Sequence, residues 1–97
     1  MAAYVIGRVT VKDAERWAEY RRRVPATLTP WGGELVLRGR RASVLAGAEE
    51  HTDVVVLQFP DLDSATGWHD SPAYQELVPL RAAAADLTLV CYEEGRG

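Results

Sequence analysis

Apolar side chains occupy both faces of several predicted strands, and this feature limits most sharply what the chain can fold into. Residues 54–59 read VVVLQF, in which Gln58 is the only polar residue. Because successive side chains of a strand point to opposite faces, each face of this strand is largely apolar. Residues 3–11 and 87–93 share the pattern, whereas a half-solvated sheet would alternate apolar and polar residues. The sheet therefore needs a cover on each face.

The predicted elements follow a β-α-β-β-α-β order. We expect strands at residues 3–11, 34–39, 54–59 and 87–93. We expect helices from residue 14 to about 24, with a further turn through 26–28, from a start within 61–64 to about 70, and at 73–85. With its second helix broken in two, this order is that of the ferredoxin-like split βαβ unit. Right-handed crossovers place the helical segments on one face of a four-stranded antiparallel sheet. We therefore expect one α+β ferredoxin-like domain over residues 1–97, with the other face of its sheet open.

Capping residues and prolines set the expected helix boundaries. Asp13 and Ser71 each carry a side-chain oxygen that can accept an N–H bond at a helix start, and Pro72 suits a first helical position. Pro25 is expected to end or kink the first helix, because proline lacks the N–H of an intrahelical bond. Residues 42–46 are apolar enough to extend the second strand beyond its glycine.

The open sheet face predicts a homodimer. A monomer would expose a large apolar surface, which soluble proteins rarely do. A second copy packed sheet against sheet would cover that surface and form a two-fold dimer. Roughly 800 Å² from each subunit makes a standard interface, and one face of a small sheet can supply this area.

Composition argues against several classes of partner. The net charge of −3 argues against nucleic-acid binding, and the run Arg21–Arg23 reads as a solvent face paired with nearby glutamates. No apolar run approaches the roughly 20 residues of a membrane span, and no signal peptide is recognisable, so a cytoplasmic location is the default.

Cys91, the only cysteine, is expected to be a buried, inert thiol. His51 and His69 match no zinc spacing, so we expect no metal and no organic cofactor.

Five stretches that cover nearly the whole chain resemble, in order, a small bacterial family known as domain of unknown function 1330. They are AYVIGRVTV, WAEYRRRVPATL, WGGELVLRG, VVVLQFPDLDSATGWHDSPAYQ and LVPLRAAAADLTLV. The block from Phe59 to Tyr74 is the most specific. The resemblance places the chain in the dimeric α/β-barrel superfamily and implies the same fold and sheet-to-sheet dimer. It implies no single activity, because relatives range from cofactor-free monooxygenases and haem-degrading enzymes to lactone isomerases and polyketide cyclases.

His69 and Tyr20 are the candidate catalytic residues. Histidine titrates near neutral pH, so His69 can act as a general base with Asp63 or Asp70 orienting its ring. The alternative is a solvated histidine on a helix surface. Tyr20 follows Trp17 by three residues and can place a hydroxyl in the cleft between helix and sheet, or serve as a core tyrosine.

Five residues are candidates for substrate binding. Arg38 lies between apolar residues of a strand, where a charge is costly unless it is paired or at a rim. It is either half of a salt bridge or an anchor for a carboxylate, which a guanidinium grips with two parallel bonds. For Arg81 the same two alternatives apply, a salt bridge within the protein or an anchor for a substrate carboxylate. Trp68 and Tyr74 suit a pocket wall or the core, and Ser71 suits a binding site or a helix cap.

These residues suggest a small apolar pocket that takes a small organic acid or aromatic metabolite without a cofactor. If the chain is an enzyme, we expect proton transfer, isomerisation or cofactor-free oxidation. One alternative is a non-catalytic binding or accessory dimer. Another is a structural module whose dimer surface is its function. The sequence leaves these alternatives open.

Overall fold

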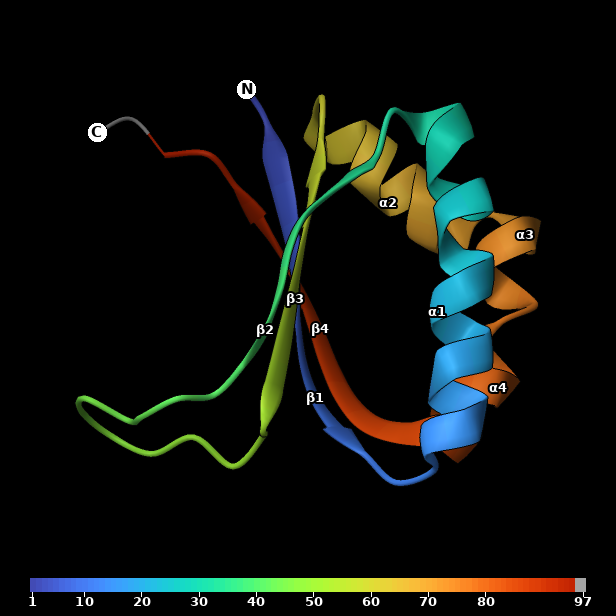
Figure 1. Cartoon of the computed structure of the whole chain (residues 1–97). Coiled ribbons are helices and arrows are strands. Elements are labelled where there is room, and N and C mark those ends of the chain that lie inside the picture. Colours follow the sequence, from blue (N-terminus) through green and yellow to red (C-terminus); the bar gives the residue numbers. More distant parts are fainter. Residues whose placement is uncertain (96–97) are drawn as a thin grey trace.

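The helices of the molecule all lie on one face of a sheet, as Figure 1 shows for the computed structural model, which describes residues 1–95. The strands are β1 (Ala3–Val11), β2 (Glu34–Arg40), β3 (Asp53–Phe59) and β4 (Ala85–Glu93). The helices are α1 (Ala14–Leu28), the short 3-10 helix η1 (Thr29–Trp31), α2 (Leu62–Asp70), α3 (Pro72–Gln75) and α4 (Val78–Ala84). All neighbouring strands in the order β2-β3-β1-β4 are antiparallel. The predicted ferredoxin-like fold is confirmed.

The register of β1 separates a buried sheet face from an open one. Val5 and Val9 point toward the helices and are buried, whereas Tyr4 and Ile6, on either side of Val5, point the other way and are half-buried. Residues directly opposite each other in antiparallel strands share a face. Leu57 is opposite Val5 and is likewise buried under the helices. The alternation of strand side chains thus gives the chain one covered face and one uncovered face.

Side-chain caps start the helices at the expected residues. Asp13 Oδ1 accepts a bond of 3.1 Å from the Arg16 N–H at the start of α1, and Ser71 Oγ accepts one of 3.3 Å from the Tyr74 N–H at the start of α3. Of the two alternatives for Pro25, an end of the helix is wrong, because α1 continues through the further turn expected at residues 26–28 and ends at Leu28. Pro25 lies so near the C-terminal end that its missing N–H removes only one bond of the last turn.

A long connection joins β2 to β3. Residues 41–52, which we call the arm, include no strand, so the expected extension of β2 through residues 42–46 is wrong. The physical reason is that β3 begins at Asp53 and offers these residues no partner strand. The arm projects from the sheet on the side without helices (Figure 1).

Aromatic side chains form the centre of the core between helices and sheet. The ring centroid of Trp68 lies 4.3 Å from that of Tyr74 and 5.4 Å from that of Phe59, and all three side chains are fully buried. Trp68 Nε1 donates a bond of 3.0 Å to Thr27 Oγ1, which itself donates to the Val24 carbonyl. Because burying a polar group without a partner is costly, these bonds make the burial of Trp68 favourable.

Cys91 is exposed, so the expectation of a buried thiol is wrong. It lies opposite Val5 on the helix-facing side of β4, but β4 is an edge strand, so the helices cover this position incompletely. No helix in residues 1–95 is both long and apolar enough to cross a membrane. Within the same residues, no three histidine, cysteine or acidic side chains cluster in a way that would hold a metal ion.

Candidate functional site

A cavity of about 230 Å³ lies between α1 and the helix-facing side of the sheet. Its walls are mainly apolar, and Trp68 closes it toward α2. The apolar lining comes from α1, β2, β3 and β4 and comprises Trp17, Val24, Leu28, Leu35, Val55, Leu57, Leu87 and Leu89. Apolar walls with few polar groups are typical of sites for small organic molecules. Four polar side chains line this cavity. Thr29 donates its hydroxyl proton to the Pro25 carbonyl, and the other three, Tyr20, Arg21 and Arg38, define the candidate site.

A β-bulge in β2 turns Arg38 toward the cavity. Leu35 is opposite Leu57 on the helix-facing side, but the register shifts before Leu37, which is opposite Val56 on the open face. Arg38 is consequently opposite Val55 and faces the helices. Bulges re-aim side chains in this way, because one extra residue reverses the alternation that follows it. Without the bulge, Arg38 would point away from the site.

Arg38 and Arg21 bring two positive charges to one end of the cavity. Neither forms an ion pair with a carboxylate of residues 1–95. Partial burial, and then repulsion from the Arg21 guanidinium, lower the pKa of Arg38, although a guanidinium remains charged at physiological pH. Two unneutralised guanidiniums beside an apolar cavity favour an anion at this point.

Tyr20 ends a buried chain of hydrogen bonds. Arg81 Nη1 donates to Tyr74 Oη over 3.0 Å, and the hydroxyls of Tyr74 and Tyr20 are 2.8 Å apart. When Tyr74 donates its proton to Tyr20, the Tyr20 proton is free to point into the cavity. Burial, with the neighbouring Tyr74, raises the pKa of Tyr20 far above its ordinary value. Tyr20 is therefore a neutral hydrogen-bond donor at physiological pH.

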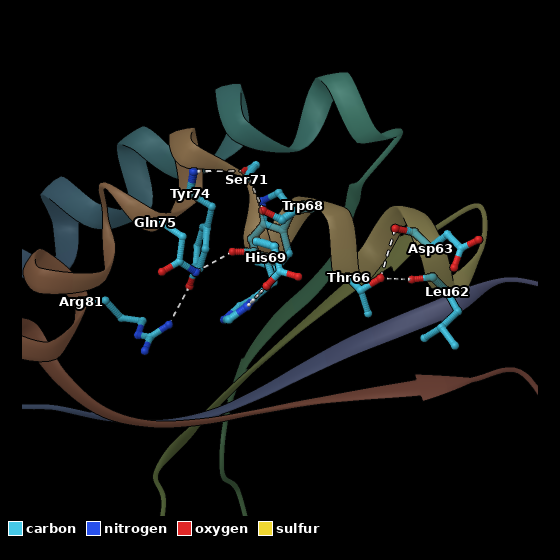
Figure 2. A network of polar contacts seen from close by, with 10 residues as sticks. Leu62, Asp63, Thr66, Trp68, His69, Ser71, Tyr74, Gln75 and Arg81 are labelled. Carbon is cyan, nitrogen blue, oxygen red and sulfur yellow. Dashed lines mark hydrogen bonds and ion pairs between the residues drawn. The ribbon is translucent and has the colours of Figure 1, made fainter.

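His69 lies at a second cavity of about 230 Å³, on the other side of Trp68. The walls of this second cavity include Val5, Trp68, Leu89 and Cys91. The His69 ring is about half exposed, with Nδ1 at 3.5 Å from the Asp70 carboxylate. Its backbone carbonyl accepts a bond from Gln75 (Figure 2). Trp68 and Leu89 line both cavities, but His69 lines only the second and Arg38 only the first, so the structure does not bring His69 and Arg38 into one cavity.

The remaining predicted site residues lie behind the first cavity. Ser71 is buried, donates to the Trp68 carbonyl over 2.6 Å and caps α3, so its hydroxyl is occupied by the backbone (Figure 2). Tyr74 and Arg81 reach the cavity through Tyr20 alone, since neither lines it. The structure thus brings together Tyr20, Arg38 and Trp68 and places the other candidates outside the cavity.

Arg21 is the site residue that the sequence reasoning missed. The sequence assigns it to a solvent-facing basic run, and it is exposed, but it also lines the cavity. The signal was present, because Arg21 follows Trp17 by four residues and precedes Leu28 by seven. These intervals place all three side chains along one helix face. An arginine in register with an apolar stripe therefore indicates a charge at the edge of a buried surface.

Solved structures share the fold at low sequence identity. A protein of unknown function from Rhodopseudomonas palustris is 22% identical with a TM-score of 0.81, over 99% of this chain and 84% of that one. A dimeric ferredoxin-like protein of unknown function from Jannaschia sp. CCS1 is 14% identical with a TM-score of 0.71, over 97% and 100%. SnoaB, a cofactor-independent oxygenase from Streptomyces nogalater, is 12% identical with a TM-score of 0.70, over 99% and 95%.

The family assignment comes from the sequence. No curated protein matches this chain significantly. The model of the family described as a domain of unknown function (DUF1330) matches residues 2–94, which is nearly the full length. The matched region contains every strand and helix that forms the cavity. The chain therefore belongs to the DUF1330 family.

Proposed function

We propose that the chain forms a homodimer whose subunits each bind a small organic acid in the cavity between α1 and the sheet. One observation carries the binding proposal: Arg21 and Arg38 line an apolar cavity without a carboxylate partner in residues 1–95. A carboxylate ligand would supply the missing negative charge, and a guanidinium binds it with two parallel bonds. The apolar walls would hold an aromatic or aliphatic body.

The open sheet face supports the homodimer. Its apolar side chains are only half-buried in the isolated subunit, and that of Tyr92 is 45% exposed. These side chains belong to neighbouring strands, so they form one continuous surface: Tyr4, Ile6, Val54, Val56, Val90 and Tyr92. A second copy would bury this surface, which a soluble monomer would leave in water. The description of a similar fold as dimeric adds support.

Ligand affinity in matched arginine variants tests the binding proposal. We would titrate the protein with benzoate, phenylacetate and hexanoate by isothermal calorimetry and repeat the best of these with its neutral amide. Arg38→Gln should weaken carboxylate binding by about tenfold or more, since a bidentate charged contact is lost. Arg22→Gln is the control, because Arg22 pairs with Glu19 on the solvent face of α1. Equal affinity in both variants, or for acid and amide, would overturn the proposal.

Cofactor-free catalysis is the second candidate function, favoured by the Arg81–Tyr74–Tyr20 chain of hydrogen bonds. A neutral Tyr20 hydroxyl backed by this chain can donate to an oxygen that becomes negative during proton transfer, isomerisation or oxidation. The role we propose for Tyr20 is thus a donor rather than a base. His69 would act only on a ligand that reaches the second cavity.

Product analysis separates an enzyme from a binding protein. Carboxylates that bind would be incubated with the protein in air and analysed by mass spectrometry for a change in mass or isotope exchange. Tyr20→Phe should change the ligand affinity by no more than a few fold. It should lower the turnover rate by about 100-fold, because the variant lacks the hydroxyl that donates a hydrogen bond to the developing oxyanion. Saturable binding without any product would favour the non-catalytic alternative.

A further inference from the structure

The tip of the arm is an apolar segment without a partner in its own subunit. Residues 42–48 read ASVLAGA and contain no charged side chain. The side chain of Leu45 is 95% exposed and that of Val44 is 45% exposed. A single exposed leucine is ordinary on a protein surface, but an uncharged run at the end of a projecting loop is not, because loops in water are usually polar.

The base of the arm is fixed by polar contacts. The Arg41 guanidinium donates to the carbonyls of Glu49 and His51 over 2.7 and 3.3 Å and so ties the two limbs together. Their backbones are joined by a bond of 2.7 Å from the Arg41 N–H to the Thr52 carbonyl. The base of the arm is therefore pre-organised, which lowers the entropy lost when the arm binds a surface.

Contacts with β1 place the arm on the open side of the sheet. Arg8 and Thr10 point to the open face, since Ile6, two residues earlier, does so. Arg8 Nε lies 3.3 Å from the Glu49 carboxylate, and Thr10 Oγ1 lies 3.0 Å from His51 Nδ1. The returning limb thus crosses the open face, and the tip extends beyond it, away from the helices (Figure 1).

We propose that the arm is a clasp that packs Val44 and Leu45 against the partner subunit of the homodimer. This inference rests on the proposed sheet-to-sheet dimer. The occupant is a second copy of this chain because the arm is continuous with the surface that such a copy would cover. Two-fold symmetry also makes each such contact occur twice, so that two leucines are buried for each dimer.

Dimer affinity in a matched pair of variants tests the clasp. The dissociation constant would be measured by sedimentation equilibrium for the wild type, Leu45→Asp and Leu62→Asp. Leu62 is 40% exposed at the first residue of α2, on the helix side, where an acidic residue is compatible with the helix start. Leu45→Asp should raise the dissociation constant by about 100-fold or more, since two buried leucines are replaced by charges. Leu62→Asp should leave it unchanged.

A photo-crosslink supplies a second readout that does not depend on affinity. Benzoylphenylalanine at position 45 should give a covalent species of twice the subunit mass on irradiation, and the same group at position 62 should not. A wild-type dimer that Leu45→Asp does not weaken, without a crosslink from position 45, would overturn the clasp and leave the homodimer standing. A monomeric wild type at all concentrations would overturn the homodimer itself, and the clasp with it.

Discussion

The two faces of the sheet have similar composition but different cover. On the helix-facing side, Val9 and Phe59 are each 1% exposed under the aromatic core. On the other side, Ile6 and Val56 are equally apolar and lie in the same strands, yet they stay partly in water. The chain therefore supplies one of the two covers that its strands require. The intrachain contact on one face and the intersubunit contact that we propose on the other would leave the same pattern in the sequence.

The largest expected effect comes from the covered face. Trp68→Ala should lower the free energy of unfolding by about 3–5 kcal/mol, because it leaves a cavity in the aromatic core and removes the partner of Thr27. Denaturant unfolding followed by circular dichroism measures this loss. Leu62→Ala is the control on an exposed helix position and should cost no more than about 0.5 kcal/mol. A loss below about 1 kcal/mol for Trp68→Ala would contradict a core built around this ring.

A substitution on the open face should weaken the association of the two subunits rather than the folding of each subunit. Val56→Arg should raise the dimer dissociation constant by about 100-fold, since it places a charge at the centre of the proposed interface. Because Val56 is only half-buried in the subunit, the monomer should still fold. Native mass spectrometry over a dilution series measures the effect, with Ala83→Arg on exposed α4 as the control. Equal dissociation constants for both variants would remove the distinction between the two faces.

A smaller effect separates packing from hydrogen bonding on the covered face. Thr27→Val keeps the shape but removes the acceptor of the Trp68 N–H, which would leave a buried donor without a partner. The expected loss in free energy of unfolding is about 1–3 kcal/mol. Thr27→Ser retains the hydroxyl and should recover most of this loss in the same denaturation assay. If serine and valine destabilise equally, the bond to Trp68 does not contribute.

The smallest effect is a pH dependence. The fold raises the pKa of Tyr20 above its ordinary value of 10.0, so at higher pH the unfolded chain loses this proton before the folded chain does. Stability from this group is complete below about pH 10 and falls as the pH rises, by about 1 kcal/mol between pH 10 and 11. When the free energy of unfolding is measured by denaturation at pH 9 and at pH 11, it should fall less between the two pH values in Tyr20→Phe than in the wild type. An equal loss of unfolding free energy in the variant and the wild type would contradict a raised pKa of Tyr20 in the folded state.

Local signals made much of the fold predictable from sequence. Asp13 and Ser71 cap helices through their own backbone neighbours, and the β-α-β-β-α-β order needs only strand and helix patterns. The predictions failed where a distant element decides the outcome. Residues 42–46 lack a strand because β3 starts too late to pair with them, and Cys91 is exposed because an edge strand is incompletely covered.

The site was predictable in its residue types but not in its geometry. Arg38 stood out as a charge in an apolar strand, yet its direction depends on a bulge that the pairing of β2 with β3 creates. His69 stood out by its chemistry, but it lines only the second cavity and Arg38 only the first. Such partitions depend on packing between elements far apart in sequence, which a linear pattern does not contain.

The position of Trp68 between the two cavities would tie the size of the ligand that we propose to the stability of the fold. Each cavity measures about 230 Å³, and Trp68 and Leu89 line both, so we expect a smaller side chain at position 68 to enlarge the space between them. The same ring is 1% exposed at the centre of the core. Proteins keep only a narrow margin of stability, so a descendant that adapts to a longer ligand through this residue must first acquire compensating mutations elsewhere. Substitutions at Arg21 or Arg38, on the edge of the cavity, would need no compensating mutations. They are therefore the easier way to change the charge of the ligand that the cavity would accept.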